Sequence, residues 1–372
     1  MPDYPETPSA VEAGAILTID LGAVRENYRQ LRSRSGPAEC AAVVKSDGYG
    51  LSAATIASAL RREGCRTFFV AHASEGLSLR RTLGAGPAIY ILNGVHPGAE
   101  ESCMAADLIA VANSAPQLAA WKEAAQRHGK QNVPVAVQID SGMSRLGISP
   151  DEVDEIAADT SAFEGLDLCL VLSHLACADE PSNPSNEAQR LTFDRLRRLL
   201  PSAPASLANS SGIYLGEPYH LDLVRPGAAL YGINPTPGRV NPMLPVVGLQ
   251  AKVIQTRRVD SDSGVGYGHA FRAAGPLDIA TIALGYGDGW PRRAAAAAWV
   301  DGKVLPFVGR VSMDSIVIDI SALSPHRLRP GDLVDLIGPR QTVDDLASCA
   351  QTIGYEILTG LGWRFHRRYL GG

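Results

Sequence analysis

The sequence predicts an α/β fold in two parts, an N-terminal (β/α)8 barrel over residues 14–240 and a C-terminal, mostly-β domain over residues 241–372. The barrel is indicated by eight short apolar, β-branched runs that alternate with segments of helical periodicity. Eight parallel strands are the number that closes a TIM-type barrel. The second part is indicated by a change after Asn234, where a linker rich in Pro and Gly leads into alternating strands without long helices.

The expected barrel strands are short, and helices are expected between them over residues 53–62, 114–127 and 186–200. An earlier run, residues 15–21, predicts a ninth strand that lies outside the barrel. The eight barrel strands are expected at residues 41–44, 68–71, 88–92, 108–112, 135–139, 168–173, 205–208 and 221–224.

The C-terminal part has the pattern of a β-rich domain. Asp301-Gly302 predicts a tight hairpin turn, because both residue types tolerate left-handed backbone. A short helix is expected over residues 343–351. The strands are expected within residues 249–259, 279–285, 303–311, 315–320 and 332–338.

Polar residues close each expected barrel strand. A buried parallel strand is apolar throughout, so polar side chains gathered at the carboxyl ends predict one shared site on the face where βα loops emerge. The alternative is that strands simply end where polarity returns, which does not account for the frequency of Lys, His and Arg. The closing residues are Lys45, His72, Asn93, Asn113, Asp140, His174, Asn209 and Arg225.

Composition excludes several classes of protein. The 372 residues are 45% hydrophobic, which excludes global disorder, and the net charge of −5 without a basic run argues against a nucleic-acid or membrane-surface partner. No apolar run approaches the roughly 18–20 residues of a membrane span. The N-terminal residues lack the regions of a signal peptide, so a cytoplasmic protein is expected. The six cysteines are dispersed without a CxxC pair, so reduced thiols and no metal site are expected.

Two strand ends carry residues typical of a ligand site: a lysine that can form an imine, and a turn that can bind a phosphate. Lys45, in AVVKSDGYG, can bind a carbonyl group covalently, although a lysine in such a position is often only solvated or salt-bridged. Arg225, in VRPGAALYG, is followed by Pro-Gly, which presents backbone N–H groups to a phosphate. The segment ANSSG at residues 208–212 adds hydroxyl donors one strand earlier.

Nine motifs in order resemble those of the alanine racemases, which are fold-type III enzymes that use pyridoxal 5′-phosphate. They are AVVKSDGYG, IDSGMSRLG, LSHLACADE, LANSS, VRPGAALYG, GVGYGHAF, GYGDGWPR, GRVSMD and GYEILTGL. The resemblance implies that Lys45 binds the cofactor covalently, that His174 packs beside its pyridine ring and that Arg225 faces its ring nitrogen. The residues implied to hold its phosphate are Tyr49, Ser210, Gly227, Ala228 and Tyr355.

The same resemblance implies a two-base racemisation of L- and D-alanine. Lys45 would carry the proton on the D-face and Tyr267 the proton on the L-face, with the tyrosine anion stabilised through a chain of hydrogen bonds from Tyr267 over His174 to Arg225. In the family, Tyr267 and Met313 come from the partner subunit, so a homodimer with shared active sites is implied. The residues implied to contact substrate are Arg145, Met313, Asp314 and, at the site entrance, Tyr286.

The sequence departs from the family pattern at three positions. Gln138 stands where many members have a lysine that becomes carbamylated and supports the arginine, so we expect Arg145 to be braced by Gln138, by a bound anion or by water. Ser206 stands where a histidine is frequent, which puts the outer end of the Arg225 hydrogen-bond chain in question, and Leu51 also replaces a frequent histidine.

Three other functions stay open. A racemase of wider scope, acting on serine for example, would share these motifs. A pyridoxal-phosphate homeostasis protein would lack the β domain, and a fold-type III decarboxylase would carry an acidic residue where Arg225 stands. The cellular role, supply of D-alanine for peptidoglycan or catabolism of alanine, is also open. His72 and His269 are expected to be ordinary polar loop residues.

Overall fold

The structure is a computed structural model that describes residues 7–294 and 296–372. It divides into two compact units. The first comprises Val24–Leu244, and the second comprises Pro245–Gly372 together with the N-terminal segment up to Ala23. The expectation that the N-terminal residues are not a signal peptide concerns residues 1–6 in part, and these residues lie outside the described part of the chain. No helix of the described part is both long enough and apolar enough to cross a membrane.

The first unit is an eight-stranded parallel barrel, as the sequence predicts. Strands β3 to β9 pair in sequential order and in parallel. The barrel closes through β10, which pairs in parallel with β2. On its other side, a parallel bridge between Asn209 and Arg225 joins the residues that follow β9 and β10. The first of the eight strands is divided into β2 (Glu39–Cys40) and β3 (Ala42–Val43), and the other seven are β4 (Thr67–Val70), β5 (Ala88–Ile91), β6 (Leu108–Ala112), β7 (Val133–Gln138), β8 (Leu166–Leu172), β9 (Ala205–Ser206) and β10 (Leu223–Val224).

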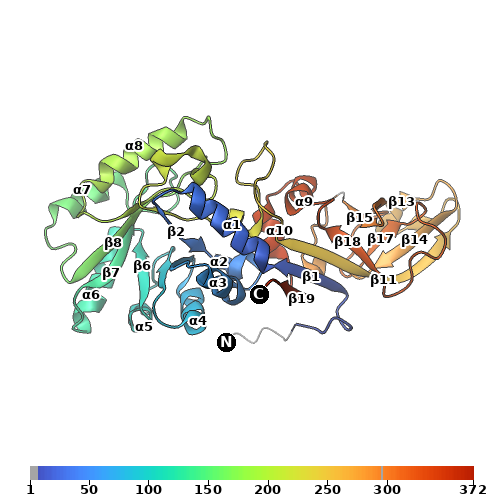
Figure 1. Ribbon diagram of the computed structural model, residues 1–372, viewed down its shortest axis with the longest axis horizontal. Coiled ribbons are helices and arrows are strands. Elements are labelled where there is room, and N and C mark those ends of the chain that lie inside the picture. The colour runs from blue at the N-terminus through green and yellow to red at the C-terminus, as the bar shows by residue number, and fades with distance from the viewer. Residues whose placement is uncertain (1–6, 295) are drawn as a thin grey trace. The chain divides into compact units, whose positions relative to one another are not determined.

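Helices between the strands cover the outside of the barrel (Figure 1). Their starts follow local sequence signals: Ser114 accepts from the N–H of Gln117 at the start of α6, and Ser149 and Glu152 form a capping box at α7. The helices are α1 (Leu21–Arg34), α2 (Lys45–Tyr49), α3 (Ala53–Arg62), α4 (Ala73–Leu83), α5 (Glu100–Ala105), α6 (Ala115–Arg127), α7 (Pro150–Ala158) and α8 (Ser185–Arg197), with 3-10 turns η1 (Gly212–Leu215), η2 (Glu217–Tyr219) and η3 (Ala228–Tyr231).

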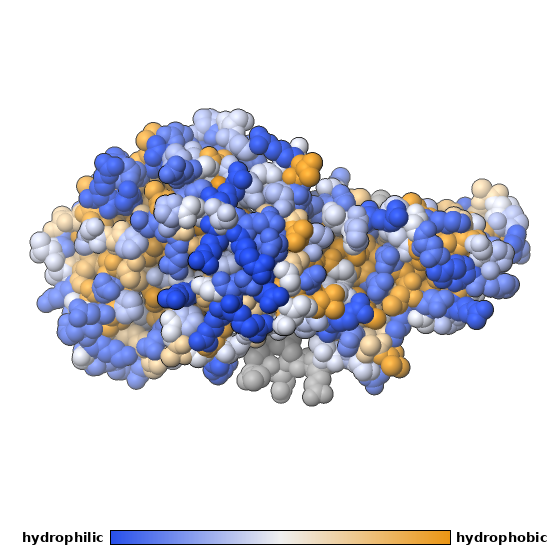
Figure 2. Space-filling model, viewed as in Figure 1, coloured by the Kyte–Doolittle hydropathy of each residue, from blue (hydrophilic) through white to orange (hydrophobic). Residues whose placement is uncertain are grey.

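The barrel interior is a packed apolar core. Phe69 and Tyr90 stack with ring centroids 4.8 Å apart, and Val111, Ala136 and Leu170 are buried with them. By contrast, the surface over α1 is hydrophilic (Figure 2), where Arg29 pairs with Glu26 and Glu63. Polar side chains within the barrel are therefore held at its ends, which leaves the carboxyl end for a site.

The second unit is built on a mixed β-sheet in the order β16-β15-β18-β11-β1-β19, with β14 joining β11 to β17. The hairpin at Asp301 and Gly302 is confirmed: both residues have left-handed φ angles, 49° and 78°, and Val300 pairs with Lys303. The strands are β1 (Ala15–Asp20), β11 (Val247–Val259), β12 (Gly264–Val265), β13 (Phe271–Arg272), β14 (Leu277–Ile282), β15 (Ala297–Val300), β16 (Lys303–Pro306), β17 (Ile316–Asp319), β18 (Leu333–Ile337) and β19 (His366–Leu370).

Two features of this unit differ from the expectation. The run at residues 15–21 forms a strand outside the barrel, as expected, but β1 pairs antiparallel with β11 and parallel with β19, so it belongs to the C-terminal sheet although the expected barrel domain began at residue 14. A long-range pairing of this kind leaves no local pattern in the sequence. The expected helix is present as α9 (Val343–Ala350), and a second helix, α10 (Gly354–Gly360), follows it.

Candidate active site

Lys45 opens an unusual turn at the carboxyl end of β3. The next four residues, Ser46, Asp47, Gly48 and Tyr49, all have left-handed φ angles, between 53° and 62°. Only glycine adopts this region without cost, so the turn must be held by its surroundings. The carboxylate of Asp47 contributes by accepting from the N–H of Ala53 at 2.8 Å.

The half-buried position of Lys45 changes the proton affinity of its amine. Burial, and next the positive charge of Arg145, lower the pKa of Lys45, whereas the carboxylate of Glu75 acts in the opposite direction. A lysine with a lowered pKa has a larger neutral, nucleophilic fraction near neutral pH.

A compact set of donors lies where β9 and β10 end. The Ser210 hydroxyl accepts from the N–H groups of Gly227 and Ala229, at 3.0 and 3.2 Å. A Cβ at Gly227 would lie 2.3 Å from the Tyr49 hydroxyl oxygen, so the missing side chain is what lets that hydroxyl approach the Gly227–Ala228 backbone. Two hydroxyls and a run of backbone amides are the groups that proteins use to bind phosphate.

Arg225 is a buried cation at the end of β10. Its guanidinium is held on two sides, donating to the Ser206 hydroxyl and to the carbonyl of Ser173. Ser206 in turn donates to the carbonyl of Leu223 at 2.6 Å. Burial lowers the pKa of Arg225 to about 10, so the guanidinium stays charged at neutral pH. Ser206, the departure noted in the sequence, thus serves as a direct acceptor for Arg225.

His174 lies beside this cation and is uncharged. Burial is the largest cause that lowers the pKa of His174 to about 3, followed by the charges of Arg225, Arg145 and Lys45. Its backbone carbonyl accepts from the amide of Gln189 at 3.0 Å. A neutral imidazole next to a fixed guanidinium can relay a hydrogen bond in either direction.

Arg145 lies on the exposed loop after β7. The carboxylate of Asp140 shapes the start of that loop by accepting from the N–H groups of Gly142 and Met143, both at 2.9 Å. The Gln138 amide donates to the carbonyl of Leu146 at 3.1 Å, so Gln138 supports the loop through the backbone next to Arg145. A bound anion or water at the guanidinium stays a prediction.

Eight of the residues singled out in the sequence thus occupy loops at the carboxyl ends of the barrel strands. Their charges and hydrogen bonds connect several of them directly. They are Lys45, Tyr49, Arg145, His174, Ser210, Arg225, Gly227 and Ala228.

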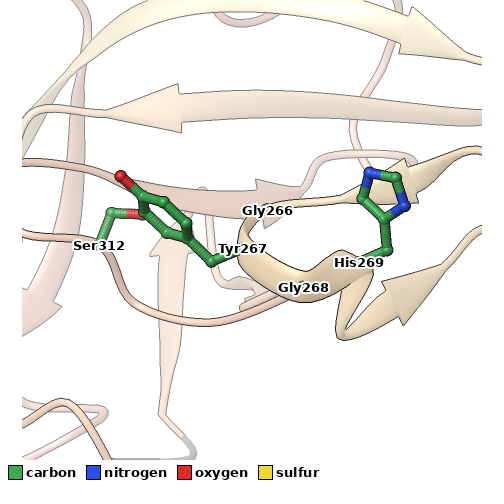
Figure 3. Close-up of a pocket in the computed structure, with 5 residues that line it drawn as sticks. All are labelled: Gly266, Tyr267, Gly268, His269 and Ser312. Atoms are coloured by element: carbon green, nitrogen blue, oxygen red, sulfur yellow. The ribbon is translucent and has the colours of Figure 1, made fainter.

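A second group gathers in the C-terminal unit. Tyr267, in η4 (Tyr267–His269), lines an open cavity of about 490 Å³ together with Ser312. Figure 3 shows the Tyr267 ring extending on the side of Ser312 and His269 pointing away from it. The Tyr267 side chain is 70% exposed within this chain. The His269 ring packs against the backbone of Gly264, where a Cβ would lie 2.3 Å from its Cγ.

The loops that carry Tyr286 and Met313 are tied together. The N–H of Tyr286 donates to the carbonyl of Ser312 at 3.1 Å, and that of Gly287 donates to the carbonyl of Met313 at 2.8 Å. Asp314 accepts from Arg364 at 2.7 Å. Tyr355 lies in α10 of the C-terminal unit. Its expected role beside the phosphate stays a prediction.

The chain matches known family models over nearly its whole length. Residues 19–235 match the family described as alanine racemase, N-terminal domain, and residues 246–369 match alanine racemase, C-terminal domain. The chain belongs to the alanine racemase family.

Individual members of the alanine racemase family are similar in sequence and in structure. A catabolic alanine racemase of Mesorhizobium japonicum is 64% identical over 98% of this chain and 95% of that protein, and one of Agrobacterium fabrum is 50% identical over 96% and 92%. The crystal structure of alanine racemase from Bartonella henselae with covalently bound pyridoxal phosphate has a TM-score of 0.92 and 41% identity, and covers 96% of this chain and 100% of that chain.

Three residues at these sites escaped the sequence reasoning. Gln189 is buried in α8 and accepts from the N–H of Ala176, 13 positions away. Arg364 donates to Asp288 as well as Asp314 across 76 and 50 positions, a pairing that no local pattern reveals. Glu75 alone carried a signal, since an acidic residue at the third position of a helix is typical of an N-terminal cap.

Proposed function

We propose that this protein is a pyridoxal-phosphate-dependent racemase that interconverts L- and D-alanine. The observation that carries the proposal is the joint placement of Lys45, the Ser210–Gly227 donor set and buried Arg225 at one end of a barrel. Membership of the alanine racemase family, and the covalently bound cofactor of the Bartonella henselae enzyme, support the same conclusion.

The residues present fit pyridoxal phosphate. Because Gly227 has no Cβ, the Tyr49 hydroxyl comes close to the Gly227–Ala228 backbone, where the Ser210 hydroxyl also lies, and these groups together suit a phosphate. Lys45 would bind the aldehyde carbon, and Tyr355 would complete the phosphate site. Arg225 would face the ring nitrogen and His174 the ring. The bound cofactor supplies delocalisation for the electron pair left at Cα when a proton departs.

The chain's own residues would carry the proton across the two faces of the substrate. Lys45 has a lowered pKa and can hold a proton at Nζ or give it up, on the face that leads to D-alanine. Tyr267 would do the same at its hydroxyl on the opposite face. Since a phenol with a pKa of about 10 is a weak base, the relay from His174 to Arg225 would stabilise its anion.

Arg225 has a second consequence in this proposal. Its guanidinium is fixed by Ser206 and Ser173 and stays protonated, so it would donate to the ring nitrogen rather than leave a proton on it. This limits electron withdrawal at the ring and so favours return of a proton to Cα over transamination.

We also propose that each site is shared by two subunits. Tyr267 and Met313 are 70% and 54% exposed in one chain, which suits side chains that reach a partner's cofactor. Arg145, Met313 and Asp314 would contact the substrate near its carboxylate, and Tyr286 would line the entrance.

For the cellular role we propose alanine catabolism rather than D-alanine supply for peptidoglycan. Two relatives, at 64% and 50% identity, are catabolic alanine racemases. A knockout that still grows without added D-alanine but no longer on alanine as sole carbon source would support this; D-alanine auxotrophy would overturn it.

The activity is tested by incubating the purified holoenzyme separately with L-alanine, D-alanine and L-serine and following the enantiomers by chiral chromatography. We expect both alanine enantiomers to reach a 1:1 mixture, and Lys45→Ala to lose at least about 10³-fold in rate, as is usual when a base is removed. Equal or faster conversion of serine would identify a broader racemase, and no conversion at all would reject the proposal.

A further inference from the structure

Glu75 connects two neighbouring loops of the site and has no role in the mechanism above. It is the third residue of α4, and one carboxylate oxygen caps that helix by accepting from the N–H groups of Ala71 and His72, at 2.7 and 3.1 Å. The other oxygen accepts from the N–H of Ser46 at 2.6 Å, 29 positions earlier in the chain.

The bond to Ser46 falls on the peptide that directly follows Lys45. Ser46 and Asp47 both have φ of 53°, a region that is unfavourable for a residue with a side chain. Such a turn persists only where its surroundings hold it. Asp47 fixes its far end through Ala53, and Glu75 fixes the end next to Lys45.

Glu75, bound to the N–H next to Lys45, is also an anion that acts electrostatically on the Lys45 amine. The other charged or titratable groups that act on Lys45 or feel it are Arg145 and His174, and neither is an anion. An anion near an amine favours its protonated form, so Glu75 opposes the effects of burial and of Arg145.

We propose that Glu75 is a positioning residue for Lys45, which holds the strained turn behind the lysine and supplies an anion that acts on its amine. The carboxylate does both at once because one oxygen is committed to α4 and the other to the lysine loop. The importance of Glu75 for catalysis rests on the proposed function of Lys45. Its effects on the Lys45 amine and on the turn can be measured independently of that function.

The test compares Glu75→Gln with Glu152→Gln as a matched control. Glu152 is also a third-position cap, of α7, and its carboxylate accepts from the N–H and the hydroxyl of Ser149, both at 2.9 Å. Both changes weaken a helix cap and remove one charge, but only the first touches the lysine turn. Glu75→Asp is the second variant, which keeps the charge and shortens the reach.

The first readout is the rate at which Lys45 reacts with an amine-selective acylating reagent, measured by peptide mass spectrometry on the cofactor-free full chain at several pH values. We expect Glu75→Gln to speed labelling at neutral pH at least about threefold, because loss of the anion enlarges the neutral fraction of the amine. Glu152→Gln should match the wild type. An unchanged rate in folded Glu75→Gln would overturn the electrostatic role.

The second readout is hydrogen exchange of the Ser46 amide in the holoenzyme. We expect faster exchange, by about tenfold or more, in Glu75→Gln and in Glu75→Asp, since either change weakens the hydrogen bond that protects this amide. Unchanged protection in Glu75→Asp would overturn the holding role even if Glu75→Gln does not fold. Failure of added pyridoxal phosphate to protect Lys45 from labelling would instead count against the proposed function, whatever the Glu75 variants do.

Discussion

At the scale of single residues, the site depends on a buried cation that ordinary side chains and backbone carbonyls hold in place. Arg225 has no carboxylate partner among its contacts in the described residues; the Ser206 hydroxyl and the Ser173 carbonyl accept its N–H groups. Neutral acceptors stabilise a guanidinium without cancelling its charge, so that charge can act on the neighbouring His174.

Removing the hydroxyl of Ser206 should therefore be costly. In Ser206→Ala the guanidinium N–H loses its acceptor in a buried place, and we expect the free energy of unfolding to fall by about 1.5–3 kcal/mol. Urea denaturation measures this. Ser58→Ala is the control, since that exposed hydroxyl donates only to its own helix, at 2.7 Å to Ala54, and should cost under about 0.5 kcal/mol. Equal losses in the two variants would show that Ser206 does not support Arg225.

His174 gives a prediction on pH. Its pKa is lowered from the ordinary 6.5 to about 3, so between these values the unfolded chain binds a proton that the folded chain does not. The free energy of unfolding must then rise with pH through that window, and the contribution is lost as pH falls from 6.5 toward 3. We expect His174→Gln to flatten this rise in urea midpoints measured from pH 4.5 to 7.5 on the cofactor-free chain. The exposed His96 is the control, and His96→Gln should run parallel to the wild type. If the curve for His174→Gln ran parallel to that of the wild type, the lowered pKa of His174 would be contradicted.

At the scale of elements, the site is assembled where loops from opposite ends of the barrel sequence meet. The loop after β3 brings Tyr49 against Gly227, in the loop after β10, because the closing strands of the ring are neighbours. The Tyr49 ring is kept in place by Tyr231, whose ring centroid lies 4.5 Å away.

Filling this meeting point should weaken cofactor binding. In Gly227→Ala the new methyl group would lie 2.3 Å from the Tyr49 hydroxyl and 3.3 Å from Cβ of Val43, so the tyrosine must move. We expect a loss of about tenfold or more in affinity for pyridoxal phosphate, measured by equilibrium dialysis. Gly248→Ala is the control, as its added Cβ has its nearest neighbour at 3.8 Å. If Gly227→Ala bound pyridoxal phosphate with unchanged affinity, the Gly227 backbone would not be part of the phosphate site.

At the scale of the whole molecule, the sequence predicts the elements that repeat and misses those that depend on distant pairing. The barrel follows from eight apolar runs, and each has a strand at or within a few residues of its expected place. The membership of β1 in the C-terminal sheet depends on Val247–Val259 and His366–Leu370, over 220 residues away, and has no local signature. The same holds for the site: strand-end residues such as Lys45 and Arg225 stand out in the sequence, whereas Gln189 and Arg364 act through contacts that only the fold creates.

The shared site can be tested by mixing two inactive variants, Lys45→Ala and Tyr267→Phe. If Tyr267 serves the partner's cofactor, each hybrid dimer contains one site with both wild-type residues. Random exchange would then restore about a quarter of the wild-type activity, because half of the dimers are hybrids with one of two sites intact. Activity no greater than the sum of the two parents would show that Tyr267 acts within its own chain, or not at all.

Exchange of the α-proton tests the central proposal most directly. The holoenzyme is incubated in deuterium oxide with L-alanine and, separately, with D-alanine, and the α-proton signal is followed by NMR while the configuration is determined in parallel. We predict that both enantiomers lose the α-proton and that deuterium appears in the opposite enantiomer. No exchange with either one, or exchange with complete retention of configuration, would contradict the account.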